Sequence, residues 1–343
     1  MDLRLSEDEE ATRDALRRLL EREVGSDVVR AAEPLGHSPK VWTSLAAAGI
    51  PAMGMPGPLG GGDADLAMLA VVAIEAGRAM APVPLVEHLV ATRVVAALDP
   101  GHPRLAELAA ASAIAAFAPL PAAHGRAELV PGGAVADVVV ALDGDDLVAA
   151  EGKPPGVAPR NHASAPIADR DLTGPDRRVL ASGADASRAF TTAAAEWRVL
   201  TAGALTGLAA AALDLVVAYV KQRHQFGVPV GSFQAVQHGL ADLPGQVLGA
   251  ELLVHEAAWA LTVGADGPTG ATRAELALMA FRFATDVAAD TTGRCVHYHG
   301  GYGVAEEQDP QLQFRRARGW ALVCGDPADD LHHLGELLAA GAG

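Results

Sequence analysis

Long runs with the periodicity of an α-helix fill the second half of the chain and constrain its fold more than any other feature. Apolar residues recur at helical spacing through 189–222, 233–263, 269–298 and 329–340. Helices of this length with modest connections can form a bundle, because each hides one apolar stripe against the others. The sequence therefore predicts a C-terminal four-helix bundle over residues 187–343.

Two other patterns precede the bundle. Helical spacing also marks residues 5–50, 65–78 and 85–98, so we expect an N-terminal helical domain over residues 1–110. Between residues 111 and 186, short apolar runs are separated by Gly, Pro and Asp, which is typical of strands and turns. The sequence predicts a small middle β domain there, and an α+β fold that is mainly α.

The charge of the chain argues against two classes of partner. It carries 26 Lys and Arg against 42 Asp and Glu, a formal net charge of -16 at pH 7. This charge repels nucleic acid and anionic lipid surfaces, so we expect neither a nucleic-acid nor a membrane partner. The apolar run 199–220 approaches membrane-spanning length but contains Asp214, and a buried helix is the better interpretation.

Two features indicate a cytoplasmic protein. Residues 1–10 are acidic and lack the basic and apolar segments of a secretory signal. Cys295 and Cys324 are too few to form a disulfide framework, so a reducing compartment is expected.

Two segments contain residues that helix packing alone does not explain. Residues 223–227 read Arg-His-Gln-Phe-Gly and are followed by Phe-Gln at 233–234, whereas residues 297–303 read His-Tyr-His-Gly-Gly-Tyr-Gly. Each has a plain structural explanation: a basic last turn followed by glycine ends a helix, and a double glycine allows a close backbone approach. Either segment alone is equally compatible with helix capping and with ligand binding.

Together, in this order and at this spacing, the two segments resemble the acyl-CoA dehydrogenase family. In that family the first segment reads Arg-x-x-Phe-Gly followed by Phe-Gln, and the second reads Gln-x-x-Gly-Gly-x-Gly. The resemblance extends to residues 42–61 and to the helix around 71–84. It implies an N-terminal helical domain, a small β domain and a C-terminal four-helix bundle, assembled as dimers or pairs of dimers around FAD.

The resemblance also implies a set of residues that hold the nucleotide part of FAD: Arg223, Gln225, Phe226, Gln234, His297, Gly300 and Gly301. Arg223 would reach the diphosphate, for which an arginine offers a rigid fork of donors, and Phe226 would shield a ring system from water. His297 stands where the family commonly has Gln. In the family these residues serve a flavin held mainly by a neighbouring subunit, so the resemblance implies an oligomer.

The catalytic base is where this sequence departs from the family. The family's reaction removes the α-proton of an acyl-CoA thioester with a carboxylate while the β-hydrogen passes as hydride to the flavin. The usual position of that carboxylate reads Cys324 here, and the variant position reads Trp197. Glu196 and Asp326 lie nearby and are the candidate bases. A shift of one residue turns a helical side chain by about 100°, however, so neither replaces the family base directly.

The middle segment departs as well, because it lacks the family's Thr-Glu-Pro and Trp-x-Thr/Ser-Asn stretches that contact the flavin ring. Some members are mixed oligomers of two related chains, as in bacterial steroid side-chain degradation. We therefore expect an acyl-CoA dehydrogenase subunit that pairs with a homologous catalytic chain and passes electrons to an acceptor. A self-sufficient homo-oligomer remains open, as does a family-like fold with a non-redox or ligand-binding role.

Two other clusters have simpler explanations. Cys295, His297 and His299 alternate along a predicted helix, where side chains two residues apart diverge, so we expect no metal site. Arg315 and Arg316 are expected to form ion pairs inside the bundle or at an interface.

Overall fold

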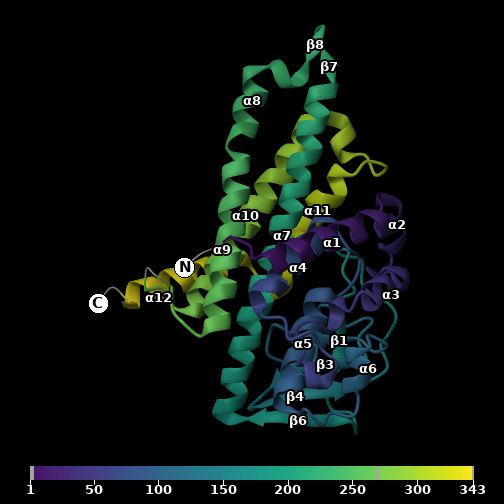
Figure 1. The fold of residues 1–343 in the computed structure, drawn as a ribbon, viewed down its shortest axis with the longest axis vertical. Helices are drawn as coiled ribbons and strands as arrows, with labels where there is room; N and C mark the ends of the chain where they lie inside the picture. The colour runs from purple at the N-terminus through teal and green to yellow at the C-terminus, as the bar shows by residue number, and fades with distance from the viewer. Residues whose placement is uncertain (1–3, 268–269, 342–343) are drawn as a thin grey trace.

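The computed structural model describes residues 4–267 and 270–341, and its architecture confirms the mainly helical α+β prediction. One helix, α7 (Gly183–Gln222), runs almost the full length of the molecule, and the other elements pack around it (Figure 1). The N-terminal helices and the sheet lie beside its first part. The remaining C-terminal helices lie beside its later part.

The N-terminal helices begin where the sequence provides a capping side chain. Ser6 and Glu9 form a reciprocal capping box at the start of the first helix, and Asp65 accepts a hydrogen bond from the backbone of Met68. The helices of this part are α1 (Glu7–Glu23), α2 (Ser26–Ala32), α3 (Pro39–Ala47), α4 (Leu66–Arg78), α5 (Leu85–Leu98) and α6 (Leu105–Ala109), with short 3-10 turns at Ile50–Ala52 and Gly57–Leu59.

The strands form a small sheet and a separate pair. The sheet has the order β1-β3-β4-β6, in which β1 and β3 are parallel and the other neighbours are antiparallel. The strands β2 and β5 pair with each other. The bounds are β1 (Ala115–Phe117), β2 (Arg126–Val130), β3 (Val138–Asp143), β4 (Asp146–Glu151), β5 (Ala168–Asp171) and β6 (Arg177–Ser182). Much of β1, β3 and β4 is buried.

The C-terminal part contains the predicted bundle helices with two differences. The run predicted as one helix over 233–263 is two helices, because the chain turns at Asp242 and Pro244 stands in the first turn of the second. A further helix, α11, was not predicted. The elements after α7 are β7 (His224–Gln225), β8 (Val228–Pro229), α8 (Gln234–Ala241), α9 (Leu243–Val263), α10 (Arg273–His299), α11 (Pro310–Ala321) and α12 (Pro327–Gly341), with 3-10 turns at Val230–Ser232, Gly300–Val304 (η4) and Leu322–Cys324 (η5).

Helix α7 is the core helix of the bundle. It is long and apolar enough to cross a membrane by length and composition, but 67% of its most apolar window is buried inside the protein. Glycines allow α4 to cross it closely: a Cβ on Gly207 would stand 1.9 Å from the Ile74 carbonyl oxygen, and one on Gly77 would stand 2.0 Å from that of Ala204. The backbones of α4 and α7 therefore touch directly.

Ion pairs fasten the N-terminal part to the bundle. Glu33, just after α2, accepts hydrogen bonds from Arg315 and Arg316 of α11, which confirms the ion pairing predicted for these two arginines. Arg30 of α2 also pairs with Asp309 at a distance of 3.0 Å. These contacts fix the end of the bundle that carries the second glycine-rich segment.

Candidate functional site

The residues predicted to hold the nucleotide lie at one end of the bundle, where three helix termini meet. Arg223 ends α7, and a tight β7–β8 hairpin with Phe226 and Gly227 at its turn projects beyond it (Figure 1). Gln234 is the first residue of α8, and His297 lies in the last turn of α10. The remaining predicted residues follow α10 in the turn η4: Gly300 and Gly301.

Contacts between helices join these two distant segments. The ring of Tyr219, in the last turn of α7, stacks on His299 at the end of α10 with ring centroids 4.0 Å apart. Arg294 of α10 donates a hydrogen bond of 2.6 Å to the backbone carbonyl of Gly239 in α8. The fold thus holds the two sequence motifs on one surface, although the 62 residues 235–296 separate them in the chain.

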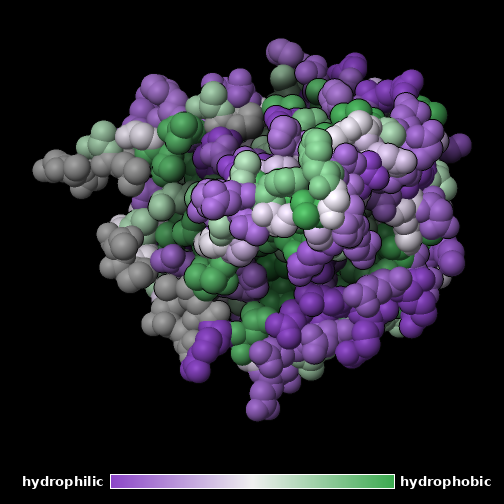
Figure 2. Space-filling model, turned by 90° about the horizontal axis from the view of Figure 1, so that it is seen from above, coloured by the Kyte–Doolittle hydropathy of each residue, from purple (hydrophilic) through white to green (hydrophobic). Residues whose placement is uncertain are grey.

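The apolar tip of this surface is uncovered. Phe226 is 94% exposed, and its ring meets the Phe233 ring edge-on, with centroids 6.3 Å apart. Phe226 also has φ of +54°, a left-handed conformation that a non-glycine residue adopts at a cost. Seen from above, this end of the molecule interleaves apolar and polar residues around a hollow (Figure 2). A bulky exposed aromatic ring of this kind is typical of a surface that binds a partner or a ligand.

The polar part of the same surface suits a dinucleotide. Among the described residues, the Arg223 guanidinium has no ion pair or hydrogen bond, so its donors are available to a phosphate group. Gly300 has φ of +63°, and a Cβ on Gly300 or Gly301 would meet no atom within 4 Å. No residue of 4–267 or 270–341 fills the space beside the two glycines. Both observations fit the nucleotide end of FAD lying against this surface.

Family profiles match most of the chain. The N-terminal domain of acyl-CoA dehydrogenases matches residues 6–99, and their C-terminal domain matches residues 187–327. The acyl-CoA dehydrogenase IpdE2 of Mycolicibacterium smegmatis is 34% identical over 338 residues, which cover 96% of this chain and 98% of the relative. The chain belongs to the acyl-CoA dehydrogenase family. Members of this family are FAD-dependent oxidoreductases, and the chain is an acyl-CoA dehydrogenase in this sense.

Other relatives agree with this assignment. The acyl-CoA dehydrogenase IpdE2 of Mycobacterium tuberculosis is 31% identical over 96% of each chain. Among solved structures, a variant of the Tcur3481-Tcur3483 steroid ACAD has a TM-score of 0.82 and 26% identity, and the match covers 98% of this chain and 99% of the other. The ChsE4-ChsE5 complex from Mycobacterium tuberculosis has a TM-score of 0.84 at 22% identity over 99% of each chain and shows the shared fold.

The two positions where the family resemblance places the base hold groups that cannot serve as one. Trp197 is buried in the core of α7 and packs against Phe281, with ring centroids 5.9 Å apart. Cys324 is half-buried, and burial raises the pKa of its thiol despite the nearby Arg198 guanidinium, whose Nη2 lies 3.8 Å from the sulfur. A thiol with a raised pKa is a poor proton acceptor at neutral pH.

The carboxylates of Glu196 and Asp326 are engaged elsewhere. Glu196 receives two hydrogen bonds from Arg93, of 2.9 and 3.1 Å, in a groove between α5 and α7. Burial alone would lower the pKa of Arg93, but the hydrogen bonds and charge of Glu196 raise it. Asp326 is exposed and accepts a hydrogen bond from the backbone of Ala328 at the start of α12. Their roles as bases stay predictions, which these surroundings disfavour.

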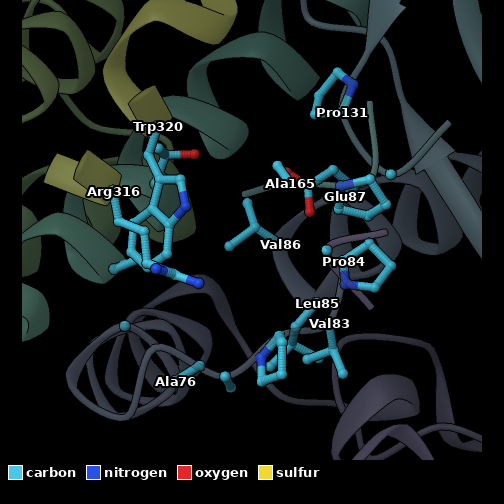
Figure 3. Close-up of a pocket in the computed structure, with 18 of the residues that line it drawn as sticks. Ala76, Val83, Pro84, Leu85, Val86, Glu87, Pro131, Ala165, Arg316 and Trp320 are labelled. Carbon is cyan, nitrogen blue, oxygen red and sulfur yellow. The ribbon is translucent and has the colours of Figure 1, made fainter. Parts of the chain in front are cut away.

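A cavity of about 100 Å³ lies between the two family base positions. Trp197 and Val323, the neighbour of Cys324, both line it, together with the start of α5 and the loops around Pro131 and Ala165 (Figure 3). Ligand pockets commonly measure about 300–1,000 Å³, so this cavity is too small to hold a flavin ring and a thioester together. This cavity therefore provides no chamber for the reacting end of FAD.

Sequence reasoning missed one residue of this cavity, Glu87. It lies in the first turn of α5, where an acidic residue is ordinarily explained by the helix dipole. The chain nevertheless turns its carboxyl toward the cavity (Figure 3). In the sequence, its position directly after the apolar segment 83–86 is the one hint of this orientation. In the structure, its neighbour His88 is fully buried.

Proposed function

We propose that this chain takes part in the flavin-dependent α,β-dehydrogenation of an acyl-CoA thioester as one subunit of a mixed oligomer with a related catalytic chain. One contrast carries the proposal. The surface that we assign to the nucleotide end of FAD is exposed: Phe226 is uncovered and Arg223 has no ion pair among the described residues. Trp197 and Cys324, by contrast, stand where the family has its base. A related partner would provide the ring pocket and the carboxylate.

The relatives support a mixed oligomer. Two structures of the same fold, the Tcur3481-Tcur3483 steroid ACAD and the ChsE4-ChsE5 complex, contain two differently named chains. By the same likeness we propose a steroid or other lipid-derived acyl-CoA as the substrate class. We also propose a cytoplasmic location, which agrees with the two free thiols of Cys295 and Cys324. As the electron acceptor we propose an electron-transfer protein.

Each residue of the exposed surface has a defined task in this proposal. FAD, when bound, would accept the β-hydrogen as a hydride, which carries both electrons of the oxidation. The Arg223 guanidinium would hold the diphosphate through paired N–H donors, and Gly300 and Gly301 would admit it close to the backbone. Phe226, with Gln225 and Gln234 beside it, would cover the adenine side and exclude water. These residues bind and position; they transfer no proton.

Co-purification tests the proposal directly. The chain is expressed alone and together with an acyl-CoA-dehydrogenase-like chain encoded in its own operon, and the visible spectrum, mass and turnover of each preparation are measured. We expect bound flavin and turnover in the mixed complex and neither in the chain alone. Full flavin content and full turnover of the chain alone would overturn the proposal and indicate a self-sufficient homo-oligomer.

A variant of the mixed complex tests the two candidate bases. Glu196→Gln combined with Asp326→Asn removes both carboxylates and keeps their shapes. Because one carboxylate is paired with Arg93 and the other is exposed, we expect turnover within about twofold of the unmodified complex. A loss of turnover of 100-fold or more, with flavin retained, would assign the base to this chain.

A further inference from the structure

A carboxyl group stands in the wall of an otherwise mostly apolar cavity. Figure 3 shows Glu87 together with Val86 and Pro84 on one side, and Arg316 and Trp320 of α11 on the other. The cavity of about 100 Å³ is well above the roughly 10–15 Å³ that a single water molecule needs. It is therefore large enough for a small ligand or for one end of a larger ligand.

The surroundings of Glu87 leave much of its hydrogen-bonding capacity unused. The nearby donors are its own backbone N–H and the indole N–H of Trp197. The indole N–H lies close enough to favour the ionised carboxyl but does not reach regular hydrogen-bond geometry, and it counts as unpartnered among the described residues. Burial has the larger effect and raises the pKa of the Glu87 carboxyl, which favours the neutral acid.

A second polar group lies on the same helix face as Trp197. Thr201 follows it by one turn of α7, lines the same cavity, and is only 5% exposed. Its hydroxyl oxygen has no hydrogen-bond partner among residues 4–267 and 270–341. Buried polar groups in folded proteins are almost always satisfied, so unsatisfied groups at one cavity indicate that something polar occupies it.

The charges around the cavity select the chemistry of that occupant. Arg316 is buried, and burial lowers the pKa of its guanidinium to about 10, so it stays charged at neutral pH. Glu33 lies 3.3 Å from Arg316 and also accepts a hydrogen bond from Arg315, so one carboxylate faces two guanidinium groups. The other polar groups of the wall can donate hydrogen bonds: the protonated carboxyl that burial of Glu87 favours, the indole N–H of Trp197 and the hydroxyl of Thr201. A wall of donors beside a cation suits an oxygen acceptor and disfavours an amine.

We propose that this cavity binds a small neutral ketone or alcohol, or the end of a larger molecule that carries such an oxygen, and that the Glu87 carboxyl forms a hydrogen bond to that oxygen. Trp197 is a positioning residue, because its indole N–H lies against the carboxyl from the other side. The carboxyl thus stands on α5, beside the tryptophan at the α7 position where some family members carry their base. The proposal depends on these residues alone and not on flavin or a partner chain.

A matched pair of probes tests the preference for oxygen. Butan-2-one and 2-methylbut-1-ene differ only in C=O against C=CH2 and have the size of the cavity. The full chain is labelled with 5-fluorotryptophan at its four tryptophans, and fluorine NMR spectra are recorded during titration with each probe. The Trp197 resonance is identified by its absence in Trp197→Phe. We expect saturable shifts of Trp197 and Trp320, with the ketone bound about three- to tenfold more tightly than the alkene.

Variants of Glu87 test the source of that preference. Glu87→Leu keeps a side chain of similar size, and we expect the ketone to lose about three- to tenfold in affinity while the alkene does not. Glu87→Gln keeps a neutral donor and should stay within about twofold of the unmodified chain. An unchanged resonance of Trp259, which lies on α9 and does not line the cavity, verifies the fold of each variant. Equal affinities for ketone and alkene in the unmodified chain would overturn the proposal even if a variant failed to fold. So would a ketone affinity that Glu87→Leu leaves unchanged.

Discussion

Replacement of Arg223 by alanine tests whether this side chain binds a ligand or stabilises the fold. Its guanidinium is exposed and forms no hydrogen bond or ion pair with the described residues, so its removal should change the free energy of unfolding by less than about 0.5 kcal/mol. A hydrogen-bonded phosphate would lose about 1.5–3 kcal/mol of binding free energy. At about 1.4 kcal/mol per tenfold, flavin affinity should fall about 10- to 150-fold.

The assay compares flavin release with thermal unfolding in whichever assembly retains flavin. Lys221→Ala is the matched control, because this exposed cation lies two residues earlier in the same helix and should leave flavin affinity unchanged. Arg223→Lys keeps the charge but loses the planar fork of donors, so an intermediate affinity is expected. The reasoning is refuted if Arg223→Ala releases flavin no faster than Lys221→Ala, or if it unfolds the chain at a clearly lower temperature.

Three further predictions concern packing and buried charge. Gly207→Ala places a Cβ 1.9 Å from the Ile74 carbonyl oxygen and should lower the free energy of unfolding in urea by about 3 kcal/mol or more. An unfolding midpoint equal to that of the unmodified chain would contradict the close crossing of α4 and α7. Arg17 donates hydrogen bonds of 2.6 and 2.9 Å to the Glu75 carboxylate, which is 1% exposed. Arg17→Met leaves this buried charge unpaired and should lower the free energy of unfolding by about 3 kcal/mol in the same assay. The double variant with Glu75→Leu should recover most of that loss. Burial raises the pKa of Glu87, so the folded chain keeps a proton that the unfolded chain releases above about pH 4.5. The free energy of unfolding should therefore fall as the pH rises from about 4.5 to the pKa of Glu87 in the folded chain. Glu87→Gln should lack this loss, and its advantage in unfolding free energy should grow by up to about 1.4 kcal/mol per pH unit across that window; a pH-independent difference would show that the carboxyl is not buried.

The local pattern of the sequence was sufficient for most helices. The predicted helices 65–78 and 85–98 differ from α4 and α5 by at most one residue, because their caps and apolar spacing are local properties. The break between α8 and α9 was missed, although Pro244 marks it. The apolar periodicity continues across the break, so the pattern predicted one helix. A proline is tolerated in the first turn of a helix, and Pro244 in fact marks the start of α9.

The candidate site, too, could be predicted from the sequence only in part. The two motifs around Arg223 and Gly300 are recognisable in the sequence because capping and ligand binding both require particular residue types at fixed spacing. Their meeting at one end of the bundle depends on the packing of α7 against α10, which no local pattern specifies. Likewise, neither the ion pair that occupies Glu196 nor the exposure of Asp326 can be derived from their neighbours in sequence.

The sequence by itself therefore determined most of the helices, the presence of a small β region and the family, through periodicity, capping and two motifs. Only the tertiary structure decided which side chains face one another: it turned Glu87 toward Trp197 in a cavity and left Phe226 uncovered. The physical reason is that periodicity selects the face of a helix that is buried. The partner of that face, and the space left between the two, depend on how segments distant in the chain pack together.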